Sequence, residues 1–343
     1  MQPSLSMSSP PAEAPLDRQP AGSDERPALR VGIASVASAV PRRTVSSKSI
    51  AEHLGVSEEW IVARTGIHER HVATAGTRLA DLASQAGRQA LARAGVRPSA
   101  VDLVLVATSS SDEVVPNTAP LVAGQLGADG AATIDIGAAC TGWVSALALA
   151  AGQLEAGRIR TAVVIGAEIM SRLLDPDDRR TAPLFGDGAG AVVLQATEGP
   201  TAIGQMVFGS DAAGADAIVI RHDEHRVRMD GISTFKHAVR RLSEATLDAL
   251  AANDQRVTDI ELFVYHQANA RILAAVGERL NLPHDRVLDV VSRYGNTSAA
   301  SIPIALSDAE RAGRLSAGSV VLVAAFGAGF TWGAGVLQWN GSV

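Results

Sequence analysis

The stretch Ala131-Ala-Thr-Ile-Asp-Ile-Gly-Ala-Ala-Cys140-Thr-Gly-Trp-Val-Ser-Ala-Leu147 holds the only cysteine of the chain. Thr133 to Ile136 is β-prone and apolar, a turn of small residues follows, and helix-forming residues run from Val144 to Ala151. The pattern predicts a strand, a tight turn and a helix that begins at Cys140. The N-terminus of a helix carries partial positive charge and unpaired N–H groups, which favour a nucleophilic thiolate. A lone cysteine can also be a small buried hydrophobic residue, so the rest of the chain must decide.

The composition narrows the class of protein. The chain has 343 residues, of which 47% are hydrophobic, and this suffices for a large core in one or two domains. The net charge of −6 gives no general electrostatic case for binding nucleic acid or a membrane surface. A single cysteine excludes a disulfide framework within the chain and a cysteine-rich metal site, so we expect a cytoplasmic protein without a metal. No apolar stretch has the length of a membrane span.

The second half of the chain repeats the pattern of the first. Cys140 lies 38 positions after Asp102, and Asn296 lies 35 positions after Glu261. The matching segments are residues 31–40 and 202–209, 79–94 and 235–252, 102–107 and 261–266, 133–151 and 286–306, and 161–167 and 319–325. Alternating helices and buried strands predict a duplicated α/β unit whose halves pack about a pseudo-two-fold axis. We expect a disordered tail at residues 1–30, which are rich in Pro, Ser and charge, and two halves at 31–200 and 201–343.

The repeat places Cys140 and Asn296 at equivalent points, each at the start of a helix after a buried strand. His266 follows the apolar strand Leu262 to Tyr265, and ligand sites in open α/β sheets favour the carboxyl ends of strands. We therefore expect the three side chains to converge. A thiolate can form an acyl-enzyme, while a neutral His and an Asn amide can hold a second, negatively charged oxygen. The glycine-rich turn around Ala328 offers a backbone N–H for the first oxyanion.

Other interpretations of these three residues stay open. Cys–His–Asn hydrolysis would use His266 as the base and Asn296 as its orienting partner. His266 can also be an ordinary residue at the end of a strand, and Asn296 a helix cap. Trp60 and Arg64 share one helical face and could stack on a purine and bind a phosphate, but an ordinary surface helix has the same spacing. The segment Phe185 to Gly190 precedes a strand, which favours close backbone packing over a phosphate-binding loop.

Six motifs together resemble those of β-ketoacyl-acyl-carrier-protein synthase III, a family of thiolase-like condensing enzymes, and the resemblance covers about Val31 to Trp339. They are Trp60-Ile-Val-Ala-Arg-Thr-Gly-Ile67, the cysteine turn, Phe185-Gly-Asp-Gly-Ala-Gly-Ala191, His266-Gln-Ala-Asn-Ala-Arg-Ile272, Gly295-Asn-Thr-Ser-Ala-Ala-Ser301 and Phe326-Gly-Ala-Gly-Phe-Thr-Trp-Gly333.

The resemblance implies a homodimer with a five-layered αβαβα fold. An acyl-CoA primer would acylate Cys140, and malonyl-acyl carrier protein would then lose carbon dioxide and attack the acyl group. By their match to the motifs, His266 and Asn296 would stabilise the enolate. The backbone amides of Cys140 and Ala328 would form the oxyanion hole. Coenzyme A thioesters would be substrates, and no separate cofactor is implied.

Further site residues are likewise implied by the resemblance alone. Trp60 and Arg179 would sandwich the adenine of coenzyme A, with Arg64 near its phosphates. The contacts to the carrier protein would come from Lys236, Gln267 and Arg271, and the acyl pocket would include Val115 and Phe326.

Two departures from the family pattern bear on the substrates. Val115 stands where a bulky aromatic residue can limit primer size, so we expect a pocket that accepts primers longer or more branched than acetyl. Glu278 stands where the family often has a lysine, which weakens the expected contact with an acidic carrier protein.

Four functions remain in order of preference. The first is the decarboxylating condensation, which initiates fatty-acid or polyketide synthesis. The second is an acyltransferase of the same fold that moves an acyl group to an alcohol, amine or carrier. An Asn that stabilises an enolate favours the first, because simple transfer forms no enolate. A hydrolase is third and a non-catalytic scaffold fourth.

Overall fold

The computed structural model describes residues 30–197 and 203–339. The disordered tail predicted for residues 1–30 lies outside the described residues, except for Arg30, which begins the first strand. The boundary predicted near residue 200 also lies outside them, so the division into 31–200 and 201–343 stays a prediction.

The first sheet has five strands in the order β1-β7-β6-β4-β5. The central strand β6 is parallel to β4 and antiparallel to β7, while β5 is an edge strand parallel to β4. The strands are β1 (Arg30–Ala39), β4 (Leu103–Ala107), β5 (Ala132–Ile136), β6 (Thr161–Ile169) and β7 (Asp187–Thr197).

The second sheet repeats this topology in the order β11-β12-β13-β8. Its strands are β8 (Ile203–Ser210), β11 (Leu262–Tyr265), β12 (Val320–Gly327) and β13 (Thr331–Gln338). β11 is parallel to β12, and β13 is antiparallel to both of its neighbours, as in the first sheet. The counterpart of β5 is reduced to one parallel bridge between Phe263 and Val287. The internal repeat in the sequence therefore corresponds to two sheets of matching strand order.

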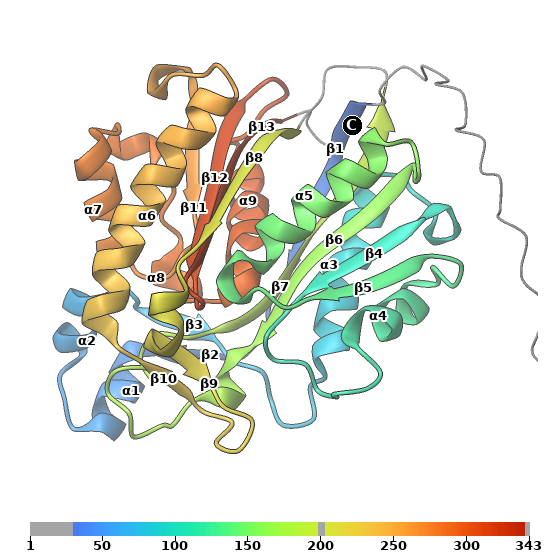
Figure 1. Cartoon of the computed structure of the whole chain (residues 1–343). Helices are drawn as coiled ribbons and strands as arrows, with labels where there is room; N and C mark the ends of the chain where they lie inside the picture. The colour runs from blue at the N-terminus through green and yellow to red at the C-terminus, as the bar shows by residue number, and fades with distance from the viewer. Residues whose placement is uncertain (1–29, 198–202, 340–343) are drawn as a thin grey trace, which may run out of the picture.

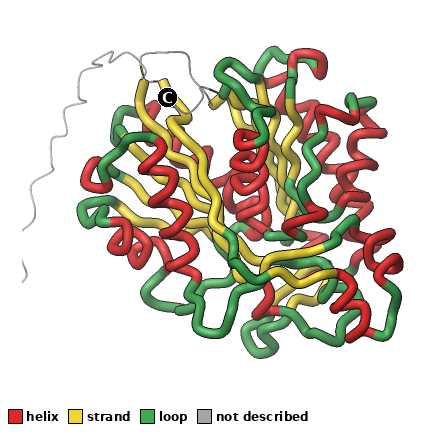
Figure 2. Tube along the Cα trace, turned by 180° about the vertical axis from the view of Figure 1, so that it is seen from behind, coloured by secondary structure: helices red, strands yellow, loops and turns green. Residues whose placement is uncertain are grey.

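Helices cover both sheets and separate them, which gives the five layers (Figures 1 and 2). Two helices lie between the sheets, α5 (Gly142–Glu155) and α9 (Ser301–Arg311). The outer face of the first sheet carries α3 (Leu79–Arg93) and α4 (Thr118–Leu126). The outer face of the second carries α6 (Gly231–Ala252) and α7 (Ala270–Leu280). Since both faces of each sheet are covered, the central strands are buried and mostly apolar, as the sequence predicts.

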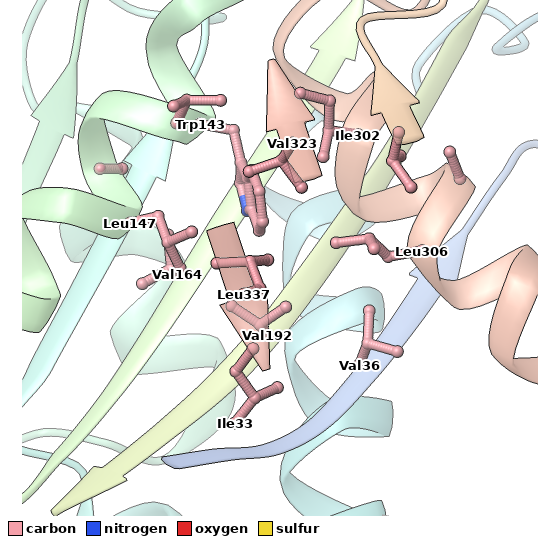
Figure 3. Close-up of a cluster of buried hydrophobic side chains, with 14 of the residues drawn as sticks. Ile33, Val36, Trp143, Leu147, Val164, Val192, Ile302, Leu306, Val323 and Leu337 are labelled. Atoms are coloured by element: carbon pink, nitrogen blue, oxygen red, sulfur yellow. The ribbon is translucent and has the colours of Figure 1, made fainter. Parts of the chain in front are cut away.

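The largest buried cluster lies between the two sheets (Figure 3). Trp143 and Leu147 of α5 and Ile302 of α9 pack there with valines and leucines of both sheets. Each fully buried side chain of this size contributes about 1.5–3 kcal/mol of hydrophobic free energy relative to an exposed one. The two helices are therefore fixed against one shared core. The helix predicted to begin at Cys140 begins at Gly142, after a 3-10 turn that contains Cys140. Asn296 likewise precedes a 3-10 turn, and α9 begins five residues later, at Ser301.

Two glycines allow α9 to approach the first sheet closely. A Cβ on Gly166 would lie 2.3 Å from the carbonyl oxygen of Ala299, and one on Gly190 would lie 2.7 Å from the backbone of Pro303. The second distance confirms close backbone packing for the glycine-rich segment. The strand predicted to begin at Ala191 begins earlier, at Asp187, because Gly188 and Gly190 are themselves paired with β6.

Short elements form the end of the molecule where the strands meet the cavity described below (Figure 1). Ser46 caps the helix that begins at Ser47, and Thr44–Ser46 pairs as a strand with Glu69–His71. The elements are β2 (Thr44–Ser46), α1 (Ser47–Leu54), α2 (Glu58–Thr65), β3 (Glu69–His71), β9 (Ile218–Ile220), β10 (Val227–Met229) and α8 (Val291–Tyr294).

Neither a membrane span nor a metal cluster is found in the described part of the chain. Within residues 30–197 and 203–339, none of the helices combines the length and apolar character that a span requires. Over the same ranges, no group of three or more His, Cys, Asp or Glu side chains is arranged to hold a metal ion.

Candidate active site

A cavity of about 1110 Å³ opens where the two halves of the chain meet. Cys140 borders it from the first half, and His266 and Asn296 border it from the second. The structure thus brings together the three side chains that the repeat predicts to converge.

Cys140 lies in a single 3-10 turn, Ala139–Thr141, between the edge strand β5 and the helix α5. Ala139 adopts a φ of 46°, which is uncommon for a residue with a Cβ and marks a tight turn. Gly327 at the end of β12 packs directly on the nucleophile, since a Cβ there would lie 3.0 Å from the Cys140 nitrogen. The turn therefore displays the sulfur at the cavity wall and keeps it close to the second half.

The surroundings of Cys140 favour the neutral thiol, although a helix N-terminus favours the thiolate. Burial raises the pKa of the Cys140 thiol to about 12. The hydroxyl of Ser298, with its oxygen 3.6 Å from Sγ, acts in the opposite direction, and the negative charge of Glu168 raises the pKa further. Burial therefore outweighs the effect that the helix N-terminus was expected to have on the thiol.

His266 ends β11, and its buried ring is held through one nitrogen. Nδ1 lies 2.6 Å from the hydroxyl oxygen of Ser301, which also accepts the backbone N–H of Gln267 at 3.2 Å. Among the described residues, nothing is hydrogen-bonded to Nε2, so this nitrogen remains available to a ligand in the cavity. Burial lowers the pKa of His266 to about 4, which keeps the ring neutral near pH 7. When the Ser301 hydroxyl donates to Nδ1, Nε2 carries the proton and is a neutral donor.

Asn296 is oriented by its own backbone neighbourhood. Its side-chain oxygen Oδ1 accepts the N–H of Ser298 at 2.9 Å, and its backbone pairs with Leu184 and Gly186 at 2.8 and 3.0 Å. The amide nitrogen Nδ2 has no acceptor within residues 30–197 and 203–339, so it is a second neutral donor at the cavity. Two neutral donors beside a buried thiol can stabilise negative charge that develops on an oxygen.

Ala328 follows β12 at the cavity wall, close to the cysteine turn. Its carbonyl accepts the hydroxyl of Thr331 at 3.0 Å, and that hydroxyl lies 2.9 Å from the hydroxyl of Thr141. This chain of hydroxyls connects the turn after β12 to the residue after Cys140. It fixes the segments that carry the two amides predicted to form an oxyanion hole.

The three residues predicted to bind coenzyme A all border the cavity. Arg64, one helical turn after Trp60, lies with its guanidinium carbon 4.2 Å from the centre of the Trp60 ring. Arg179 donates to the carbonyl oxygen of Leu54 at 2.9 and 3.2 Å. The sandwich of an adenine between Trp60 and Arg179 stays a prediction.

Gln267 is wrongly predicted to contact a carrier protein. It is only 1% exposed, and its amide nitrogen donates to the carbonyls of Tyr265 and Leu288 at 2.8 and 3.0 Å. Its side-chain oxygen accepts the N–H of Val290 at 2.8 Å. A fully bonded, buried amide fixes the strand end beside His266 and cannot reach a partner protein.

Lys236 and Arg271 are exposed at the rim of the same cavity, on α6 and α7. The guanidinium carbon of Arg271 lies 5.7 Å from the ring centre of Phe235, which holds it at the rim. The two cations remain accessible to a macromolecule that approaches the cavity.

The two residues predicted for the acyl pocket lie in different places. Phe326 is buried and borders the cavity beside Cys140. Val115 is 83% exposed and does not border the cavity of its own chain, whereas its neighbour Val114 does. The prediction for Val115 is therefore wrong for a single chain, because the loop before α4 turns this side chain outward.

The sequence analysis missed three residues that support the site. Ser298 and Ser301 bond to Cys140 and His266, and both fall within the quoted motif around Asn296. Glu168 accepts the Ser298 hydroxyl from the otherwise apolar strand β6. An acid in a strand with no other charged residue was the signal available for it.

Comparison with known proteins identifies the relatives of this chain. The family described as 3-oxoacyl-[acyl-carrier-protein] synthase III matches residues 134–212, and its C-terminal part matches residues 250–339. A β-ketoacyl-[acyl-carrier-protein] synthase III of Rhodospirillum centenum is 43% identical, over 91% of this chain and 99% of that protein.

Solved structures agree with this relationship. The 3-oxoacyl-(acyl carrier protein) synthase III of Pseudomonas aeruginosa superposes with a TM-score of 0.87 at 40% identity, covering 92% of this chain and 99% of that one. A priming β-ketosynthase from a polyketide biosynthetic pathway gives a TM-score of 0.89 at 35% identity, covering 93% and 99%. The fold and the family predicted from the sequence are confirmed.

Proposed function

The chain belongs to the β-ketoacyl-[acyl-carrier-protein] synthase III family, and from this premise we propose that it condenses an acyl-CoA primer with malonyl-acyl carrier protein. The reaction is a decarboxylative Claisen condensation that starts a fatty-acid or polyketide chain. The observation that carries the proposal is the convergence of one thiol and two neutral donors, Cys140, His266 and Asn296, on one cavity.

The first half-reaction uses Cys140. Its sulfur attacks the thioester carbonyl carbon of the primer, the carbonyl oxygen becomes negative, and coenzyme A leaves as a thiol. The backbone amides of Cys140 and Ala328 are the donors we assign to this oxyanion, because both segments border the cavity and are tied together through Thr141 and Thr331. The acyl group remains on Cys140.

The second half-reaction uses the two neutral donors. The malonyl thioester loses carbon dioxide, and the electron pair of the broken C–C bond forms an enolate. Nε2 of His266 and Nδ2 of Asn296 donate to the enolate oxygen, and neither donor adds a positive charge that would bind the ground-state carboxylate more tightly. The enolate carbon then attacks the acyl group and releases Cys140.

Product analysis separates this activity from simple acyl transfer. Incubation with butyryl-CoA and malonyl-acyl carrier protein should release one carbon dioxide for each β-ketoacyl-carrier product, measured by mass spectrometry of the carrier. Acetyl-CoA serves as the comparison primer. Transfer of the butyryl group to an acceptor without carbon dioxide release would support the acyltransferase of the same fold and contradict condensation.

We assign the coenzyme A site to the cavity mouth at Trp60, Arg64 and Arg179. The Trp60 ring offers a flat face for the adenine, and two exposed guanidinium groups offer charge for the phosphates. Stacking would require Arg64 to leave the ring face, and the negative phosphates supply the attraction for that movement. Arg179 then remains the candidate for the opposite side of the base.

The Trp60→Ala protein should bind acyl-CoA more weakly with little change in kcat. Loss of one base-stacking ring costs about 1–2 kcal/mol, so KM for acyl-CoA should rise roughly 5- to 30-fold. The control substrate is the acyl thioester of N-acetylcysteamine, which has no adenine and should show an unchanged KM. An equal rise in KM for both thioesters would show that Trp60 does not bind the adenine.

A carrier protein and a second copy of the chain are the proposed partners. Lys236 and Arg271 stand exposed at the cavity rim, where they suit an acidic carrier. The edge strand β5, with Ile134 50% exposed, and the outward-facing Val115 are apolar surface that a homodimer would cover. We place the enzyme in the cytoplasm, where a single thiol stays reduced, and assign it no cofactor beyond its coenzyme A substrate.

A further inference from the structure

Glu168 is a fully buried carboxyl group at the end of the central strand β6. The hydroxyl of Ser110 donates to Oε2 at 2.6 Å, and the hydroxyl of Thr108 donates to the same oxygen at 3.2 Å. The backbone N–H of Ser109 lies 3.2 and 3.1 Å from the two carboxyl oxygens. No cationic side chain within residues 30–197 and 203–339 pairs with Glu168. A buried carboxylate without a counter-ion needs a reason to be there.

A further partner of Glu168 leads to the nucleophile. The hydroxyl of Ser298 donates to Oε1 of Glu168 at 2.9 Å, and the Ser298 oxygen accepts from Sγ of Cys140 at 3.6 Å. Ser298 is itself held rigidly, since its N–H is bonded to Oδ1 of Asn296 and its φ is 47°. One hydroxyl therefore bridges the two acidic groups of this end of the cavity.

The charges of the two acids are coupled. Burial raises the pKa of the Glu168 carboxyl, although its hydrogen bonds act in the opposite direction. The negative charge of Glu168 in turn raises the pKa of the Cys140 thiol. Each group is therefore easier to deprotonate while the other is neutral, and one negative charge on the pair is the favoured total over a range of pH.

We propose that Cys140 and Glu168 share one proton through the hydroxyl of Ser298, with Glu168 as the positioning residue that holds the proton while the sulfur is a thiolate. The proposal deepens the condensing function proposed above, because it rests on Cys140 as the acyl acceptor. It adds a residue and a bridge to the three groups that converge at the cavity.

The proton transfer balances without any further reactant. The S–H bond of Cys140 breaks as the Ser298 oxygen takes that proton, and Ser298 gives its own proton to Oε1 of Glu168. The net charge of the pair stays at one negative charge, now on sulfur. The Cys140 sulfur then attacks the thioester carbon, and the bond from this carbon to the coenzyme A sulfur breaks. Glu168 returns the proton through Ser298 to the coenzyme A sulfur, which leaves as a thiol.

His266 is the other residue that could accept this proton, and its environment disfavours that role. Burial lowers the pKa of His266 to about 4, so a charged imidazolium at this position is unfavourable. Transfer to Glu168 moves one charge between two buried sites, whereas transfer to His266 would leave Glu168 and the thiolate both negative beside each other.

The rate of alkylation of Cys140 by iodoacetamide, measured from about pH 6 to pH 10, tests the shared proton. Cys140 is the only cysteine of the chain, so the label reports one site. Only the thiolate reacts. In the native protein the rate should rise with pH, stay level over an interval, and rise again. The titratable groups here are Cys140, Glu168 and His266, and the first two form a coupled pair. The Glu168→Gln protein should show one continuous rise of about tenfold per pH unit.

Two variants complete the test. Glu168→Asp keeps a carboxyl group and should keep the level interval, whereas Ser298→Ala removes the bridge and should shorten or abolish it. Asp187→Asn is the matched control, because Asp187 is also a fully buried carboxyl group, bonded to Ala73 and Ser171 instead, and its loss should leave the interval unchanged.

The native protein alone can overturn the proposal. If the alkylation rate of the native protein rises in one continuous step, about tenfold per pH unit, no proton is shared. This result comes from the native protein, so it holds even if a variant fails to fold. The assay uses neither acyl-CoA nor carrier protein, so that result would leave the condensing function untouched. Conversely, a chain that shows the level interval but forms no β-ketoacyl product would contradict the function and leave the shared proton in place.

Discussion

The Cys140→Ala protein is expected to lose condensation almost completely while it still decarboxylates the malonyl thioester. Removal of a nucleophile that forms a covalent intermediate lowers turnover by a factor on the order of 10⁴ to 10⁶. The decarboxylation needs only the donors on His266 and Asn296, which are positioned by Ser301 and Ser298 and do not depend on the sulfur. The two activities should therefore separate in one variant.

Two measurements on the same sample follow this separation. Mass spectrometry of the carrier protein measures the β-ketoacyl product, and release of labelled carbon dioxide measures decarboxylation. Cys140→Ser is the matched control, because it keeps a nucleophilic atom of smaller size and should leave a trace of condensation. Condensation by the Cys140→Ala protein within tenfold of the native rate would contradict a covalent role for Cys140.

The Asn296→Ala protein is expected to lose decarboxylation and condensation but to keep acylation of Cys140. Loss of one preorganised donor to a developing oxyanion lowers the rate by about 10²- to 10³-fold, and this loss should fall on decarboxylation and condensation. Acylation of Cys140 by acyl-CoA should persist, because we assign that oxyanion to the amides of Cys140 and Ala328. Removing Asn296 also frees the N–H of Ser298, so the acylation rate checks that the bridge to Cys140 survives.

A variant of similar size separates the donor from its shape. Asn296→Asp keeps the oxygen that accepts the Ser298 N–H but replaces the amide nitrogen with a second carboxyl oxygen. It should decarboxylate at least as slowly as Asn296→Ala, because a carboxylate repels the enolate. Decarboxylation by the Asp protein at the native rate would show that Asn296 is structural only.

The repeat in the sequence predicted the duplicated α/β unit, and the family resemblance implied its five layers. Spacing paired Asp102 with Glu261 and Cys140 with Asn296, and the two sheets have matching strand orders. One local error has a local cause. Gly190 lies inside the strand that was predicted to begin at Ala191, and the absence of a side chain there lets α9 pack directly on it.

The site was predictable as far as it follows the backbone. Cys140, His266 and Asn296 each lie in a segment that directly follows a strand or directly precedes a 3-10 turn and helix, so the fold alone brings them to one cavity. Side-chain placement was not predictable in the same way. Gln267 follows His266 in a polar motif, but its amide turns inward and is fully bonded, and Val115 turns outward in a loop whose path no periodic pattern specifies.

Glu168 shows a different limit of sequence reasoning. Its strand reads as fully buried, and a single acid in such a strand predicts either a strand end or a functional group. Only the structure shows that its carboxyl accepts the Ser298 hydroxyl from the other half of the chain, 130 positions away. The thiol behaves similarly, because the helix start that favours a thiolate is visible in the sequence and the burial that opposes it is not.

The central claim is that Cys140 takes the acyl group from coenzyme A before the malonyl substrate reacts. The most direct measurement is the intact mass of the protein after incubation with butyryl-CoA alone, followed by peptide mapping. The account predicts a mass increase of one butyryl group, located on the peptide that contains Cys140, which disappears when malonyl-acyl carrier protein is added. An unchanged mass, with β-ketoacyl product still formed on addition of the malonyl carrier, would contradict it.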